Sequence, residues 1–120
     1  MMIRNLLWVG FGGFLGSILR YACYLIPVKT DSFWTTLIVN IIGSFIIGLI
    51  MAFVNKGVVI SEELRVFLTV GICGGFTTFS TFSMEMTQLS QQGKWISFSL
   101  YLSLSIIGGI FAFIAGQKYV

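Results

Sequence analysis

Four long apolar stretches, separated by short polar segments, account for almost the whole chain. Residues 5–28 carry a single charged side chain, Arg20, and residues 32–55, 66–84 and 95–117 carry none. A helix needs about 20 apolar residues to cross the hydrocarbon core of a bilayer. We therefore predict an all-α membrane protein with four transmembrane helices, whose approximate limits are 3–26, 33–54, 64–87 and 95–117.

The connections between these stretches are short, and no soluble domain fits between them. We therefore expect one four-helix transmembrane domain over residues 1–120. Arg4 and the apolar run after it also resemble a secretory signal peptide. No clear small-residue cleavage site follows, and the apolar stretch resumes after Arg20, so we expect the first helix to be retained.

The composition agrees with a membrane protein. Hydrophobic residues make up 57% of the chain and charged residues only 9%, and the mean hydropathy is +0.98. Soluble domains carry about 25% charged residues, so a soluble domain is excluded. A disordered protein is also excluded, because disordered chains contain far fewer hydrophobic residues than this one. The chain has no histidine, and its two cysteines lie far apart in apolar surroundings, which excludes a disulfide framework and a CxxC metal site. The basic residues are scattered singly, so no nucleic-acid partner is expected.

The distribution of positive charge is unusually even. With four spans, both termini lie on the same side of the membrane, and basic residues set the orientation by their excess on the cytoplasmic side. Four basic residues fall on the side of the termini and three on the other, namely Arg4, Lys56, Arg65 and Lys118 against Arg20, Lys29 and Lys94. This near balance is compatible with insertion in both orientations, although small proteins also give noisy counts.

Small residues recur four positions apart in each predicted helix. This spacing lets helix backbones approach closely in lipid. The residues concerned are Gly12 and Gly16, Ser44 and Gly48, Gly71 and Gly75, and Gly108, Ala112 and Gly116. A tight four-helix bundle leaves little room for water inside one subunit, so we expect any aqueous pathway to lie at a subunit interface.

Polar side chains interrupt the second and fourth apolar stretches along one helix face each. Asn40 lies near the middle of the second stretch, with Thr36 and Ser44 on the same face. An amide in hydrocarbon must be hydrogen-bonded, so these residues either join helices or line a permeation path. The fourth stretch places three hydroxyls at steps of four, followed by a glycine at position 109: Ser97, Tyr101 and Ser105.

The third apolar stretch contains the most informative pattern. Gly74 and Gly75 are followed by Thr77 and Thr78, a combination that forms a poor helix interior. We therefore predict a helix break in the membrane at this point. Freed carbonyls can coordinate a cation there, and freed amides can hold an anion. A flexible kink without a ligand is the alternative.

Two phenylalanines, Phe79 and Phe82, follow the predicted break. The edge of a phenyl ring is positive, so an anion can lie against it without a lysine or arginine nearby. Ser80 and Thr81 add hydroxyl donors, and Asn40 adds an amide donor. Together these groups suit weak anion binding along a path, although packing is the more usual role of phenylalanine in membranes.

Arg20 and Glu85 are the charged residues closest to the apolar stretches. Either they mark the ends of spans, with Arg20 extending to an interface, or they line the vestibules of a pathway.

Three segments resemble the Fluc (CrcB) family of fluoride channels. They are GGFLGSILRY at residues 12–21, TLIVNIIGSFIIG at 36–48 and GICGGFTTFSTF at 71–82. The resemblance covers almost the whole chain in size, number of spans and order of motifs, and the glycine–threonine–phenylalanine segment is specific.

The resemblance implies an antiparallel, dual-topology homodimer in a bacterial plasma membrane, with two fluoride pathways lined by both subunits. It also implies a structural sodium ion on the two-fold axis, held by the backbone carbonyls of Gly74 and Thr77 of both chains. Gly75 and Thr78 are the alternative ligands if the register differs by one residue.

The resemblance further implies a role for most of the polar residues described above. The fluoride pathway would be lined by Asn40, Phe79, Ser80, Thr81, Phe82, Tyr101 and Ser105, and the vestibules by Arg20 and Glu85. A third hydroxyl of the last helix would fall at Gly109, where this chain has none. The implied function is passive export of fluoride, which needs no catalytic residue, so no enzymatic activity is expected.

Two other classes of protein share some of these features. Small multidrug transporters also have four spans and dual topology, but they depend on an acidic residue in the first span, and this chain has none there. A structural subunit of a larger membrane complex would explain the small-residue faces but not the hydroxyl-rich third stretch.

Overall fold

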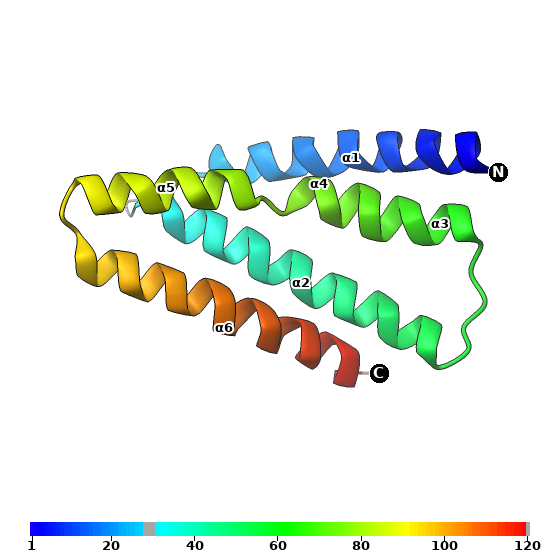
Figure 1. Ribbon diagram of the computed structural model, residues 1–120. Coiled ribbons are helices and arrows are strands. Elements are labelled where there is room, and N and C mark those ends of the chain that lie inside the picture. Colours follow the sequence, from blue (N-terminus) through cyan, green and yellow to red (C-terminus); the bar gives the residue numbers. More distant parts are fainter. Residues whose placement is uncertain (28–30, 120) are drawn as a thin grey trace.

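The computed structural model describes residues 1–27 and 31–119, and the described chain is helical almost throughout (Figure 1). Four helical segments are long and apolar enough to cross a membrane, as predicted: Met2–Tyr24, Phe33–Asn55, Glu62–Gln91 and Trp95–Tyr119. The first, second and fourth are the single helices α1, α2 and α6. Lys29, which enters the charge count, lies outside the described residues.

The third segment is composite. Its elements are α3 (Glu62–Val66), the π-helix η1 (Phe67–Cys73), α4 (Gly74–Phe76) and α5 (Phe79–Gln91). The chain leaves the helical conformation at Thr77 (ψ 158°) and Thr78 (φ −150°, ψ 121°). The predicted break therefore exists, and Figure 1 shows it as a short link between α4 and α5.

The break does not lie at the glycine pair, where we expected the helix to unwind. Gly74 has helical angles (φ −63°, ψ −39°), and Gly75 lies within α4. A side chain at Gly75 would lie 2.7 Å from the Gly13 carbonyl oxygen, so this glycine allows α4 to pack closely on α1. The extended residues are the two β-branched threonines that follow, which favour this conformation.

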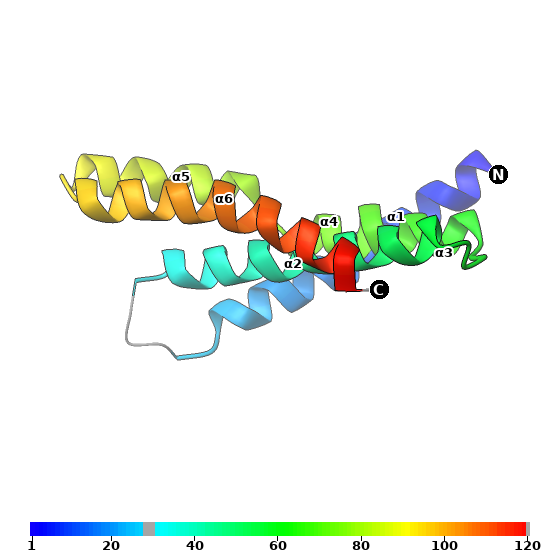
Figure 2. The same cartoon turned by 90° about the horizontal axis from the view of Figure 1, so that it is seen from below.

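The helices pack in two close pairs, α1 with η1 and α4, and α2 with α6 (Figures 1 and 2). Glycines allow both contacts. A Cβ atom at Gly12 would lie 2.9 Å from Gly71 Cα, and one at Gly116 would lie 2.8 Å from Leu49 N. The predicted small-residue faces are therefore helix contacts inside one chain, as expected for close packing in lipid.

Local signals explain where the helices begin and end. Gly57 (φ 86°) and Gly93 (φ 71°) adopt the left-handed conformation just after α2 and α5 end. The Ser61 side chain accepts a hydrogen bond from Leu64 N at the start of α3, and the Thr78 side chain accepts one from Thr81 N at the start of α5. Both termini lie toward the end of the bundle where α2 connects to α3 (Figure 1).

The tightly buried core lies between α2, α5 and α6. Its buried members are Phe33, Leu37, Met86, Leu89 and Tyr101. Most other large apolar side chains are exposed over the outer surface of the single chain. Such a surface suits lipid or a partner chain rather than water.

Candidate functional site

Asn40 of α2 stabilises the break in the third segment. Its amide nitrogen donates to the Thr78 carbonyl (3.1 Å), and its amide oxygen accepts from the Thr78 N–H (2.8 Å). Both backbone groups that the break frees at Thr78 are thereby satisfied in an apolar environment, where an unpaired group is costly. One of the two amide hydrogens of Asn40 remains available for another acceptor.

The same contacts determine which backbone carbonyls stay free. In an α-helix, each N–H donates to the carbonyl four residues earlier. Thr78 N donates to Asn40 instead of to Gly74, and Thr81 N donates to the Thr78 hydroxyl instead of to Thr77. The carbonyls of Gly74 and Thr77 therefore lose their helical donors.

The two alternative cation ligands are already engaged. The Gly75 carbonyl accepts from Arg20 Nε (3.0 Å), and the Thr78 carbonyl accepts from Asn40. The Arg20 side chain thus contacts the backbone of α4, just before the break. Gly74 and Thr77 therefore fit a sodium ion better than Gly75 and Thr78, because main-chain oxygens at broken helices are known ligands for this ion.

Side chains offer no competing metal site in the described residues, where no three His, Cys, Asp or Glu side chains lie together. The candidate ligands are therefore oxygens of the main chain. One chain contributes two such oxygens, which do not enclose a cation, so the set needs further ligands.

The two phenylalanines after the break lie in different environments. Their ring centroids are 5.6 Å apart, with 40° between the planes. Phe82 packs edge-to-face on Tyr101 (5.0 Å, 71°), whereas Phe79 is 77% exposed in the single chain. Phe82 is therefore held by the core, and Phe79 projects from the surface.

Three hydroxyl groups cluster at the start of α5. Thr78 Oγ1 donates to Thr81 Oγ1 (3.2 Å) and lies 3.3 Å from Ser80 Oγ. The adjacent hollow, of about 250 Å³, is lined by Asn40, Ser44, Ile47, Thr77, Thr78 and Phe79. The structure thus brings the predicted amide and one predicted phenylalanine together at the break.

Glu85 lies inside the bundle, within the third membrane-spanning segment, and is 5% exposed. Its carboxylate accepts one hydrogen bond from the Tyr101 hydroxyl and one from the Ser32 hydroxyl, both 2.9 Å long. Tyr101 is fully buried and uses its only hydroxyl hydrogen in this bond. Phe79, Phe82, Tyr101 and Glu85 therefore form a continuous run of contacts along α5 and α6.

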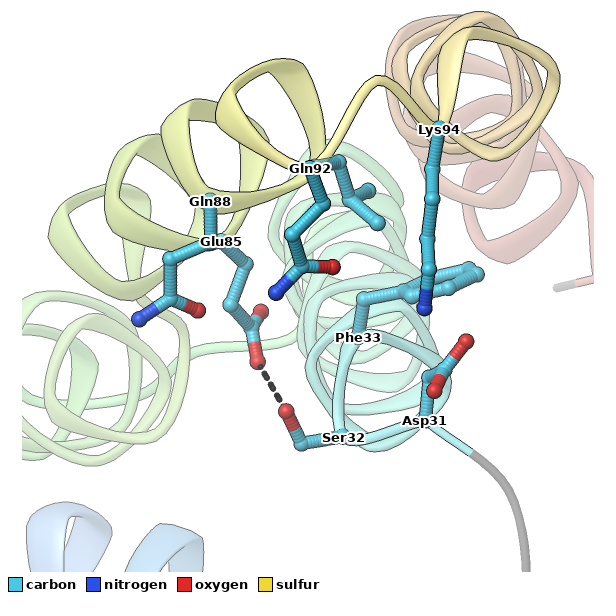
Figure 3. A pocket seen from close by; sticks show the side chains of 8 residues that line it. Asp31, Ser32, Phe33, Glu85, Gln88, Gln92 and Lys94 are labelled. Atoms are coloured by element: carbon cyan, nitrogen blue, oxygen red, sulfur yellow. Dashed lines mark hydrogen bonds between the residues drawn. The ribbon is translucent and has the colours of Figure 1, made fainter.

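A polar pocket of about 110 Å³ lies at Glu85. Figure 3 shows Glu85, Gln88 and Gln92 on one side of it and Lys94 and Asp31 on the other. Arg20 does not line this pocket, so the two predicted vestibule residues lie in different places.

Several polar residues near Glu85 were not predicted from the sequence. The glutamines at 88 and 92 follow Glu85 at steps of three and four along one face of α5, a spacing that could have indicated a polar face.

The hydrogen bond between the Tyr24 and Thr36 hydroxyls (2.5 Å) joins α1 to α2. No local pattern in the sequence indicates this contact.

Ser105 lies apart from the run of contacts that Phe79, Phe82, Tyr101 and Glu85 form. Its hydroxyl oxygen is buried and has no hydrogen-bond partner among the described residues. It borders a hollow of about 400 Å³ between α2 and α6, lined by Ser44, Ser105, Ile106, Gly109, Ile110 and Phe113.

Comparisons with known proteins give a consistent result. The family described as "CrcB-like protein, Camphor Resistance (CrcB)" matches residues 7–117. Relatives named fluoride-specific ion channel FluC occur in Chlorobium phaeobacteroides (45% identity, covering 98% of this chain and 92% of the relative) and in Chlorobaculum tepidum (42%, 97% and 94%). Another from Leptospira interrogans is 41% identical, covering 92% of this chain and 90% of the relative.

The four membrane-spanning helices and the relatives named as ion channels indicate that the chain is a multi-pass bacterial membrane protein. Because the family model and the relatives both cover nearly its full length, the chain belongs to the CrcB-like protein family.

Proposed function

We propose that this chain forms a fluoride-selective ion channel that exports fluoride passively from the bacterial cytoplasm. The relatives named above are ion channels and not enzymes. The observation that carries the proposal is the break at Thr77 and Thr78, which places uncharged donors and a phenylalanine ring beside one hollow.

The fluoride pathway would use these groups without any cationic trap. Asn40 keeps one amide hydrogen, and Ser80 and Thr81 carry hydroxyls that lie beside the Thr78 hydroxyl at the break. Phe82 and Tyr101 would extend the path as aromatic walls, since Tyr101 donates its hydroxyl hydrogen to Glu85, and Ser105 would add a hydroxyl. Weak binding at several such sites lets an ion leave as readily as it enters, whereas a nearby lysine would hold it. A small, strongly hydrated ion needs close donors in a narrow path, and these donors would fit chloride less well because it is larger.

The channel would be an antiparallel homodimer with two pathways. Phe79 is 77% exposed in one chain, and a ring lining an ion path needs a second wall opposite it. A partner chain would supply that wall and cover apolar surface. The even charge count, four basic residues against three, supports insertion in both orientations.

A sodium ion would bind where the breaks of the two subunits meet. The carbonyls of Gly74 and Thr77 from both chains would hold it, because their helical donors are used elsewhere. The ion would supply positive charge that holds four main-chain oxygens together between the subunits.

The direction of transport follows from the membrane potential. Hydrogen fluoride enters a cell as a neutral acid and dissociates inside, which traps the anion. A negative-inside potential favours exit of one negative charge by about 2.3 kcal/mol per 100 mV. A channel therefore suffices for export, without energy coupling.

The test is efflux from liposomes that contain only the purified protein. Vesicles loaded with potassium fluoride and potassium chloride are diluted into a solution without either halide, a potassium ionophore is added to balance the charge, and each halide is followed with its own electrode. We expect rapid fluoride release, little chloride release, and no release from protein-free vesicles. Vesicles that retain fluoride, or that release both ions equally, contradict the proposal.

A further inference from the structure

Ser44 of α2 borders two hollows on the surface of the chain. One is the hollow at the break, with Asn40 and Phe79, and the other lies between α2 and α6, with Ser105 and Gly109. Among the described residues, Ser44 is the one side chain that these two linings share. A route from the break toward Ser105 would therefore pass the Ser44 hydroxyl.

Among the described residues, the hydroxyls of Ser44 and Ser105 have no hydrogen-bond partner. Hydroxyls on helices usually donate to the carbonyl four residues earlier, and four residues here do so at 2.8 to 3.0 Å: Thr69, Thr77, Ser83 and Thr87. Ser44 makes no such bond within residues 1–27 and 31–119, and Ser105 Oγ is buried without a partner. A buried hydroxyl such as that of Ser105 is normally hydrogen-bonded. Ser44 is half-buried and lines both hollows, so its hydroxyl is open to an external acceptor.

Gly109 explains why Ser44 is accessible from the hollow between α2 and α6. A Cβ atom built on Gly109 would lie 3.8 Å from Ser44 Oγ and, apart from its chain neighbours and the backbone of its own helix, would meet no other described atom within 4 Å. The absence of a side chain at Gly109 thus leaves open the space in front of the Ser44 hydroxyl. Tyr101, Ser105 and Gly109 follow at steps of four on α6, and Ser44 brings a hydroxyl from α2 to the position where α6 has none.

We propose that Ser44 is a fluoride-coordinating residue that connects the site at the break to Ser105 and replaces the hydroxyl that α6 lacks at Gly109. This inference rests on the proposed fluoride channel. The ligand is a small, strongly accepting anion, because a hydroxyl can donate its hydrogen to it while the surrounding groups add no positive charge.

The experiment compares fluoride efflux from liposomes for four proteins: the unchanged chain, Ser44→Ala, the double variant Ser44→Ala with Gly109→Ser, and Ser103→Ala. Ser103 is an exposed hydroxyl of α6 that lines neither hollow, so it is the matched control. Size-exclusion chromatography checks that each variant keeps the assembly of the unchanged chain.

We expect Ser44→Ala to reduce fluoride efflux about tenfold, since a hydrogen bond to a charged group is lost. Ser103→Ala should conduct normally, and the double variant should recover much of the loss because Gly109→Ser returns a hydroxyl to the same space. Normal efflux in Ser44→Ala, or no recovery in a double variant with intact assembly, overturns the role of Ser44. Failure of the unchanged chain to release fluoride overturns the proposed function itself, so the two failures are distinguishable.

Discussion

Asn40 and Thr78, which are 38 residues apart in the sequence, are joined by two hydrogen bonds that run in opposite directions. The amide of one side chain thereby replaces the two helical partners that Thr78 lacks. The polar residue in the middle of α2 thus has a structural role, and its remaining amide hydrogen is the part available to an ion.

Replacing Asn40 with alanine should destabilise the protein. Thr78 N and O would both lose their partners, and each unsatisfied group costs about 1–3 kcal/mol. Thermal unfolding in detergent should show a clear decrease in Tm, and fluoride efflux should fall with it. Ile38→Ala on the same helix is the control, because Ile38 is 55% exposed. Equal Tm values for the two variants would contradict a supporting role for Asn40.

Replacing Tyr101 with phenylalanine removes the hydroxyl that donates to Glu85. Tyr101 is fully buried, so water does not readily enter the place of the lost hydroxyl, and we expect a loss of about 1–3 kcal/mol in stability. Tyr21→Phe makes the same chemical change at a side chain that is 66% exposed. Thermal unfolding should show a lower Tm for Tyr101→Phe and an unchanged Tm for Tyr21→Phe. The same decrease in Tm for both variants would argue against the buried contact.

Replacing Phe79 or Phe82 with isoleucine tests the aromatic part of the pathway. We expect the loss of a ring edge that faces the anion to decrease fluoride flux by up to about tenfold, which corresponds to about 1.4 kcal/mol. Phe82→Ile should also lower Tm because its ring packs on Tyr101, whereas Phe79→Ile should not, since Phe79 is largely exposed. Phe111→Ile, at a position 64% exposed on α6, is the control. Unchanged flux in both test variants would remove the rings from the mechanism.

Removing sodium should weaken the assembly. In buffer with N-methylglucamine in place of sodium, we expect a lower Tm and less dimer in crosslinking experiments. Thr77→Ala keeps the main-chain carbonyl and should keep this sodium dependence. Stability that is independent of sodium would speak against the ion, and loss of the dependence in Thr77→Ala would assign the ligand to the hydroxyl instead.

The general architecture could be predicted because it depends on local properties of the sequence. Four stretches of sufficient length and hydropathy predicted four helices, and all four are present. The segment of glycines and threonines predicted a break, which lies at its threonines. The spacing of small residues predicted close helix contacts, which α1 makes with η1 and α4, and α2 makes with α6.

The details that could not be predicted depend on tertiary contacts. The paired glycines suggested unwinding, but Gly75 is required by the proximity of Gly13 and stays helical. The hydrogen bond from Arg20 to the Gly75 carbonyl spans 55 residues and has no local pattern. Glu85 was expected near the end of a span because its charge was counted, whereas Tyr101 and Ser32 satisfy its carboxylate inside the bundle.

The two extended threonines let one stretch of chain change neighbours halfway across the bundle. Before the break, η1 and α4 contact α1, and after it α5 contacts α6. The link acts as a crossover whose length fixes the rotation of α5 about its axis. Inserting one residue into α5 between the link and Glu85 would turn the rest of α5 by about 100°, since a helix has 3.6 residues per turn. Glu85 would then face away from Tyr101, so the number of residues between the break and Glu85 matters as much as their chemistry.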